Sequence, residues 1–402
     1  MDTNPPPGGV TDIRPSTPDG AEPPPTPPGG RLAGVDLARA IALFGMFAVH
    51  VGPDPANVGG IPGAFLELFR GRSSALFATL AGLSLVLISG RTHPKTGREG
   101  RQVKARIALR ALILIVLGTG LTMLGTHISV IIPYYGVYFL LALPLLLRGA
   151  ATLTAAATLV ALVGPFLTFA PLVIPESWLD TFAAYDPVNA LDGRGFIDLV
   201  LVGAYPAVTW MAYVFAGMAL GRADLEAVRV RKRLAATGCA LVAAGYGGSW
   251  LVLHVFTDLH LAVDAAAARG SASAAEQDGS LTERLLVASP HSGTTFELVG
   301  NVGVAILVIV LAVSALAALP RLRRIASPVI AIGSMSLSAY VAHILAVRYV
   351  DAEGLLGSTG AVLVALVLLS VFFAALWSRF FRRGPLEHLL HAATAGPAKL
   401  VR

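Results

Sequence analysis

Residues 31–51 read RLAGVDLARAIALFGMFAVHV and form the first long apolar run of the chain. Asp36 and Arg39 lie near one end of this run, and His50 lies near the other. A helix rises about 1.5 Å per residue, so we expect Arg39 and His50 to lie roughly 16 Å apart, about half a bilayer. Ionisable groups within a membrane span are costly and are candidates for a functional site. The alternative is that Asp36 and Arg39 anchor the span at the interface while His50 caps its far end.

The composition is that of a membrane protein with several spans. Of the 402 residues, 55% are hydrophobic and only 13% are charged, which excludes an ordinary soluble protein. Aromatic residues make up 7% while Leu, Val and Ala dominate, a balance that favours helices over an outer-membrane barrel. We therefore expect an all-α fold, a polytopic integral membrane protein. The net charge of +6 sorts by loop, as membrane topology requires, and indicates no nucleic-acid partner.

Ten apolar runs are long enough to cross a bilayer, so about ten transmembrane helices are expected. They lie near 34–52, 73–90, 105–124, 130–147, 152–174, 196–220, 234–256, 298–319, 327–349 and 359–379. Pro133 and Pro144 bracket the fourth run and are expected to shorten or kink it. Residues 1–30, rich in Pro and Gly, are expected to form a disordered cytoplasmic tail. An N-terminal membrane region, 31–220, and a C-terminal one, 221–402, then make one continuous membrane domain.

The distribution of Lys and Arg predicts the orientation, because cytoplasmic loops are rich in these residues. With ten spans, 22 of the 30 fall on one side and 6 on the other, while Arg39 and Arg110 lie just inside their spans. Both termini are therefore expected in the cytoplasm, with the protein in the cytoplasmic (inner) membrane. The long connections near 53–72, 175–195 and 257–297 then face outward. A polar acceptor is expected on that side, since binding residues collect on loops.

Polar residues in four stretches are candidates for chemistry. They are His50; Arg72, Ser73 and Ser74 in FRGRSSALFATLAG; His291, Glu297 and Asn301 in SPHSGTTFELVGN; and Tyr340 and His343 in GSMSLSAYVAHILAV. The imidazole of His50 is suited to act as a general base near neutral pH, and Arg72 to hold an anionic or oxyanion group. As structural alternatives, His50 is hydrogen-bonded at the interface and Arg72 is an outer anchor. No HExxH or CxxC motif occurs and Cys239 is the single cysteine, so no metal is expected.

Residues 289–301 combine polar density with the start of a span. Thr294 or Thr295 can cap the helix, with Glu297 closing a capping box. This structural explanation leaves His291 and Asn301 unexplained.

Span nine presents a polar stripe, because Ser336, Tyr340 and His343 share a helical face. The stripe either lines a cavity or forms a hydrogen-bonded seam between helices. We predict that one outward-facing cavity is lined by His50, Arg72, His291 and His343.

Arg39 and His50 are separated by ten residues and match the Arg-X10-His motif of membrane-bound acyltransferases of the acyltransferase-3 type. The stretches GVDLARAIALFGMFAVHV and GRSSALFATLAG resemble the catalytic region of heparan-alpha-glucosaminide N-acetyltransferase. The second half, with YPAVTWMAYVFAGMALGR, GSMSLSAYVAHI and GPLEHLLH, resembles the YeiB-like domain of unknown function 418. Together these resemblances cover nearly the whole chain from residue 31.

The resemblance implies an acyl-CoA-dependent O- or N-acyltransferase. It would move an acetyl or similar group from cytoplasmic acyl-CoA, with acetyl-CoA as the expected donor, to an extracytoplasmic sugar or glycan. Arg39 would face the CoA and His50 would be the catalytic histidine. The catalytic candidates are His50, Arg72 and His291, and the substrate-binding candidates are Asp36, Arg39, Ser73, Ser74, Glu297, Asn301, Tyr340 and His343. The alternative is a transporter or scaffold with a polar intramembrane path. The oligomeric state is left open, with a homodimer as one option.

Overall fold

Every regular element in the described part of the chain is a helix, which confirms the all-α class. The computed structural model describes residues 32–169, 178, 195, 196, 198–256, 285–352 and 360–399. The predicted tail, 1–30, and most of the long connection 257–297 lie outside these residues. All the helices belong to one compact unit, Ala33–Arg402. The expected division at residue 220 stays a prediction.

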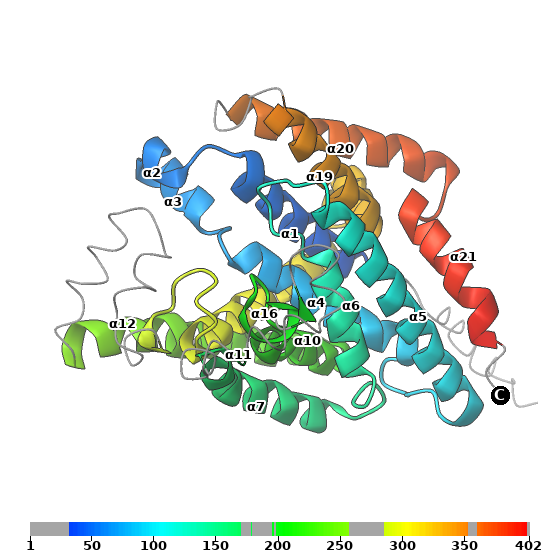
Figure 1. The fold of residues 1–402 in the computed structure, drawn as a ribbon, viewed down its shortest axis with the longest axis horizontal. Helices are drawn as coiled ribbons and strands as arrows, with labels where there is room; N and C mark the ends of the chain where they lie inside the picture. The colour runs from blue at the N-terminus through cyan, green and yellow to red at the C-terminus, as the bar shows by residue number, and fades with distance from the viewer. Residues whose placement is uncertain are drawn as a thin grey trace, which may run out of the picture. The chain divides into compact units, whose positions relative to one another are not determined.

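The helices follow the apolar runs of the sequence (Figure 1). The first part comprises α1 (Ala33–Val51), α2 (Pro55–Val58), α3 (Gly60–Glu67), α4 (Arg72–Ser89), α5 (Gly97–Thr122), α6 (Ile132–Ala142) and α7 (Ala150–Phe169). Next come η2 (Asp198–Val202), α10 (Ala207–Gly221), α11 (Val228–Val242), η3 (Ala243–Gly247), α12 (Gly248–Leu251) and η4 (Val252–Phe256), where η marks a π-helical turn. The last part comprises α16 (Thr295–Ala318), α17 (Pro320–Ile325), α18 (Ser327–Ser334), α19 (Ser336–Ala352), α20 (Gly360–Phe380) and α21 (Pro385–Lys399).

Seven helical segments among the described residues are long and apolar enough to cross a membrane. They are Ala33–Val51, Gly60–Ser89, Gly97–Thr122, Ala150–Thr168, Val228–Val255, Thr295–Ala318 and Gly360–Phe380. The bent pair of α18 and α19 adds an eighth if it is counted as one span. The structure thus supports a multi-pass membrane protein, whereas the expected count of about ten is not confirmed.

The difference in count comes from three of the ten predicted runs. The fourth run forms only the 11 residues of α6, which begins at Ile132 with Pro133 in its first turn, so the predicted shortening by proline is found. The sixth run gives the 15 residues of α10, which starts after Pro206. The ninth run is bent by 86° between α18 and α19. Each of these runs is apolar enough to span, but no straight helix uses its full length.

Helix α1 lies at the centre of the bundle, as its sequence suggested. It contacts α4, α16, α18, α19 and α20. A Cβ added at Gly333 of α18 would lie 1.7 Å from the carbonyl oxygen of Asp36, so only glycine allows the two backbones to approach this closely. The polar residues of α1 are therefore surrounded by helices from both halves of the chain.

Candidate functional site

Two histidines from distant parts of the sequence meet inside the bundle. His50 lies in the last turn of α1, while His343 lies in α19 and is 1% exposed. Nδ1 of His50 and Nε2 of His343 are 3.3 Å apart, and the two rings lie within 9° of parallel with centroids 5.0 Å apart. Only one of these two nitrogens can carry the proton of the hydrogen bond, since the other must accept it. The pair can therefore hold one proton between α1 and α19.

Aromatic side chains pack against His343 of this pair. Phe47 stacks on His343 with ring centroids 4.6 Å apart, and the ring of Tyr340 meets His343 edge-on at 5.9 Å. The hydroxyl of Tyr340 accepts a hydrogen bond from the N–H of Ile131 at 3.2 Å, so its own proton remains available to a neighbour. The predicted stripe on span nine therefore turns its Tyr and His toward other helices.

One nitrogen of the pair lacks a partner. Nδ1 of His343 is buried and makes no hydrogen bond to any residue that the structure describes. Leaving a buried polar atom unpaired costs about 1–3 kcal/mol. Such an atom beside a second histidine points to a site for a polar ligand or water.

Glu297, in the first turn of α16, is the centre of a second polar group. Its carboxylate accepts hydrogen bonds from the N–H groups of His291 and Gly293, both at 2.7 Å, and from the side chains of Ser292 and Asn301, both at 3.2 Å. Glu297 is 3% exposed. His291 and Gly293 have φ angles of 63° and 66°, and this backbone conformation brings both N–H groups to one carboxylate.

One of the two hydrogen bonds of the capping box predicted for α16 is found. Thr294 is the N-cap, and its hydroxyl accepts a hydrogen bond from the N–H of Glu297 at 3.2 Å. In a capping box the glutamate would reach back to the N–H of Thr294. Among the described residues the Glu297 carboxylate instead bonds the loop upstream of the cap, so it fixes that loop.

Asn301 connects Glu297 to Arg72 through a tyrosine. The amide of Asn301 donates to the hydroxyl of Tyr213 at 3.0 Å, and its oxygen accepts from the hydroxyl of Tyr246 at 2.5 Å. The guanidinium of Arg72 lies 4.7 Å from the ring centre of Tyr246, a cation–π contact. Asn301 is 2% exposed, and these hydrogen bonds occupy its side-chain amide. Asn301 therefore connects neighbouring side chains within the protein, and its role in binding substrate stays a prediction.

His291 is exposed and lies beside the aromatic rings of Tyr205 and Trp210, with centroid distances of 5.6 and 6.0 Å. The structure thus brings His50 and His343 into direct contact and places Arg72 against Tyr246. The single cavity shared by all four predicted residues stays a prediction.

Ser73 and Ser74 have structural surroundings. The hydroxyl of Ser74 donates to the carbonyl of Gly71 at 2.9 Å within its own helix start. Ser73 is 5% exposed, and a Cβ added at Gly45 of α1 would lie 2.1 Å from its oxygen. Ser73 therefore lies at the close contact of α4 with α1, Ser74 bonds the start of its own helix, and the role of both in binding substrate stays a prediction.

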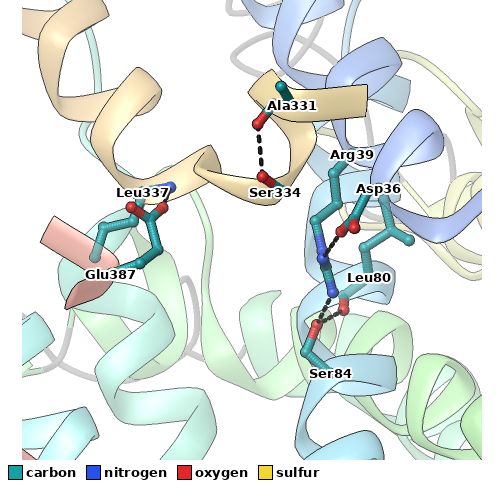
Figure 2. Close-up of polar contacts among 8 residues, drawn as sticks. All are labelled: Asp36, Arg39, Leu80, Ser84, Ala331, Ser334, Leu337 and Glu387. Carbon is teal, nitrogen blue, oxygen red and sulfur yellow. Dashed lines mark hydrogen bonds and ion pairs between the residues drawn. The ribbon is translucent and has the colours of Figure 1, made fainter. Parts of the chain in front are cut away.

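Asp36 and Arg39 form an ion pair one helical turn apart, with Nη1 of Arg39 and Oδ1 of Asp36 separated by 2.5 Å (Figure 2). Nη2 of Arg39 donates to the hydroxyl of Ser84 in α4 at 2.7 Å, and that hydroxyl donates to the carbonyl of Leu80 at 2.5 Å. The side chains of Asp36 and Arg39 are 4% and 17% exposed. The pair therefore joins α1 to α4, which is more than an interfacial anchor would do.

Helix α19 begins against a carboxylate from α21. Oε1 of Glu387 accepts hydrogen bonds from the N–H groups of Leu337 at 2.7 Å and Ser338 at 3.2 Å, and Oε2 accepts the Ser338 hydroxyl at 2.5 Å. Figure 2 shows the carboxylate beneath the first turn of the helix, beyond the break after Ser334. A negative charge is favourable at this end of a helix. Glu387 thereby fixes the start of the helix that carries His343.

Ser84, Tyr246 and Glu387 are not among the candidate residues predicted from the sequence. Ser84 is a lone hydroxyl in an apolar run, a weak signal for a partner of a buried arginine. Glu387 follows Gly-Pro at the start of α21, where an acidic residue is ordinary. The described residues contain no group of three or more His, Cys, Asp or Glu that could hold a metal ion.

The fold is that of a multi-pass membrane protein, and the contact of His50 with His343 inside its bundle of apolar helices is a candidate proton-transfer site. The sequence profile of heparan-alpha-glucosaminide N-acetyltransferase, catalytic, matches residues 31–254, more than half of the chain, and the chain belongs to this family. Residues 266–397 match a second profile, protein of unknown function (DUF418). The two matches confirm the resemblances to the catalytic region of heparan-alpha-glucosaminide N-acetyltransferase and to the domain of unknown function 418, although residues 205–222, which were assigned to the second, lie within the first match. A comparison with proteins of curated function found no match. His50 lies in the first matched region and His343 in the second.

Proposed function

We propose that the chain is a transmembrane acyltransferase that moves an acetyl or similar acyl group from cytoplasmic acyl-CoA to a sugar or cell-envelope glycan across the membrane. Membership of an acetyltransferase family supports group transfer. The observation that carries the proposal is the contact of His50 with His343, whose second nitrogen is buried without a partner among the described residues.

Acyl transfer needs a base for the proton of the acceptor and donors for the developing oxyanion. A hydroxyl or amine of the acceptor attacks the thioester carbonyl, and Nε2 of His50 takes its proton. The carbon–sulfur bond then breaks, and the CoA thiolate takes that proton from His50. Nε2 of His343 bonds the other nitrogen of His50 and so orients the base. Tyr340 is the candidate donor to the oxyanion because its hydroxyl proton remains available.

The acceptor would approach from the side of His291 and Arg72. His291 is exposed, and its loop is held by Glu297 through two main-chain hydrogen bonds. Arg72 offers a positive charge supported by the ring of Tyr246.

The test of the proposal is calorimetric binding of acetyl-CoA to the purified protein, followed by transfer of a labelled acetyl group to glycan acceptors. We expect saturable binding and transfer that depends on His50. If acetyl-CoA neither binds nor donates its acetyl group, a transporter with a proton or solute path, or a scaffold, would be favoured over an acyltransferase.

Arg39→Lys is expected to weaken acyl-CoA binding about tenfold while changing turnover at saturation little. A guanidinium can serve Asp36, Ser84 and a phosphate with its separate N–H groups, whereas an ammonium is a single point charge. Isothermal titration with acyl-CoA gives the affinity and single-turnover transfer gives the rate. Ser84→Ala is the matched control because it removes the link to α4 and keeps the guanidinium. An unchanged affinity in Arg39→Lys, or an equal loss in both variants, would remove the donor-binding role of Arg39.

Both termini are proposed to lie in the cytoplasm, on the basis of the 22-to-6 distribution of Lys and Arg that the ten-span assignment gives. Reporter fusions after residue 95 and after residue 275 should then report the cytoplasm and the exterior, respectively. Two reporters on the same side would contradict this topology and the assignment of donor and acceptor sides.

A further inference from the structure

The motif GPLEHLLH has no part in the proposed function, and it lies against the motif GSMSLSAYVAHI at the break between α18 and α19. Gly384 is buried, and a Cβ added there would lie 2.5 Å from the Cβ of Met335 and 2.9 Å from the Oγ of Ser338. The N–H of Leu386 donates to the hydroxyl of Ser338 at 2.9 Å. Residues 384–387, which we call the GPLE clasp, therefore contact the break at close range.

Glu387 of the clasp serves main-chain groups that a bent helix leaves without their usual partners. In a continuous helix the N–H groups of Leu337 and Ser338 would bond the carbonyls four residues earlier, in the last turn of α18. The chain bends by 86° at this point, and both N–H groups instead bond Oε1 of Glu387, at 2.7 and 3.2 Å. One carboxylate oxygen thus takes the place of two main-chain carbonyls.

Helix α18 is held on the other side of the break without the clasp. Gly333 lies against the main chain of Asp36 in α1, and the hydroxyl of Ser334 donates to the carbonyl of Ala331 at 2.8 Å. Figure 2 shows both sides of the break, with Ser334 at the end of α18 and Glu387 at Leu337. The bend itself is therefore the feature that depends on residues 384–387.

We propose that the GPLE clasp keeps α18 and α19 bent and that Glu387 is a positioning residue for His343. Without the carboxylate, the two N–H groups regain acceptors when α18 and α19 join into one straight helix, since lipid offers none. Straightening moves α19 relative to α1 and separates His343 from His50, which are in contact in the bent form. The effect on acyl transfer rests on the proposed function, whereas the clasp does not.

The bend is measured as a distance between spin labels at residues 327 and 349, exposed positions on α18 and α19. Double electron–electron resonance is recorded on the full chain with Ser327→Cys, Tyr349→Cys and Cys239→Ala, because Cys239 is the single native cysteine. Straightening should lengthen this distance by roughly 10 Å, from the rise of the two helices and a right-angled bend. We expect one short distance with Glu387 present and a longer population in Glu387→Ala.

Two further variants and a control complete the distance measurement. Gly384→Val keeps the carboxylate but inserts atoms where Met335 lies, so it should give the longer distance too. Glu387→Gln keeps one acceptor oxygen and should give a smaller long population, and it carries the comparison if Glu387→Ala does not fold. His388→Gln, at the exposed next position, should keep the short distance. The short distance retained in either Glu387→Ala or Gly384→Val would overturn the clasp.

Single-turnover acyl transfer tests the positioning role. Glu387→Ala should lower the rate by about 10²-fold, the scale for a misplaced catalytic group, with unchanged affinity for acyl-CoA. An unchanged rate, or an equal loss of rate and affinity, would overturn the positioning role. A longer distance in Glu387→Ala without acyl transfer by the wild type would leave the clasp standing and remove the proposed function. Transfer that requires His50, with the short distance kept in Glu387→Ala, would do the reverse.

Discussion

His50→Ala is expected to lower the single-turnover rate of acyl transfer by about 10²-fold or more, the usual scale for losing a general base. Affinity for acyl-CoA should change little, because His50 lies roughly 16 Å along α1 from Arg39. His343→Ala should lower the rate too, since Nε2 of His343 orients the base. The two losses should not add in the double variant, because the histidines act as one unit. The measurement is single-turnover transfer of a labelled acyl group, with affinity determined in parallel.

The matched control is His254→Ala. His254 is exposed and stacks on Trp250 at a centroid distance of 4.9 Å, so its loss should leave transfer unchanged. Full transfer by His50→Ala would contradict the proposed catalytic role of His50 and favour a transport or scaffold role over the acyltransferase. Additive losses at His50 and His343 would show that the two histidines act separately.

The positions of the helices were largely predictable, because apolar length is a local property, whereas the number of spans was not. Each predicted run contains a helix, but hydropathy does not predict where a helix ends within an apolar run. The bend between α18 and α19 falls at Ser334–Ser336, inside a run that is apolar on average, and the close approach of Gly333 to Asp36 is a tertiary contact. Only proline gave a usable warning, at Pro133 of α6.

Candidate polar residues can be selected from the sequence, whereas the contacts between them cannot, and their role in a functional site stays a prediction. Asp36 and Arg39 pair within one helix, where spacing alone places them together. His50 and His343 are 293 positions apart, and hydropathy says nothing about which helices are neighbours. The capping residue Thr294 follows from local pattern. The path of the Glu297 hydrogen bonds does not, since it depends on the φ angle of His291.

Glu297→Ala is expected to lower the free energy of unfolding by on the order of 3 kcal/mol. The change leaves two main-chain N–H groups and two side-chain donors without their acceptor, and each unsatisfied buried donor costs about 1–3 kcal/mol before relaxation. The stability of Glu297→Gln should lie between those of the wild type and Glu297→Ala. An amide keeps one acceptor oxygen, but its NH2 group is a donor and faces the loop donors that the second carboxylate oxygen accepted. Denaturant titration of the purified protein, followed by tryptophan fluorescence, measures the difference.

Glu67→Gln is the control for this second prediction. Its side chain is 44% exposed and its ion pair with Arg70 spans 3.6 Å, so the free energy of unfolding should change by no more than about 0.5 kcal/mol. Substitution of Glu297 should also impair the proposed acceptor site, because the Glu297 carboxylate holds the main chain of His291. Transfer to the acceptor should therefore fall in Glu297→Gln at temperatures where the protein is still folded. If Glu297→Ala is as stable as Glu67→Gln, other contacts fix the loop, and the role assigned here to Glu297 is wrong.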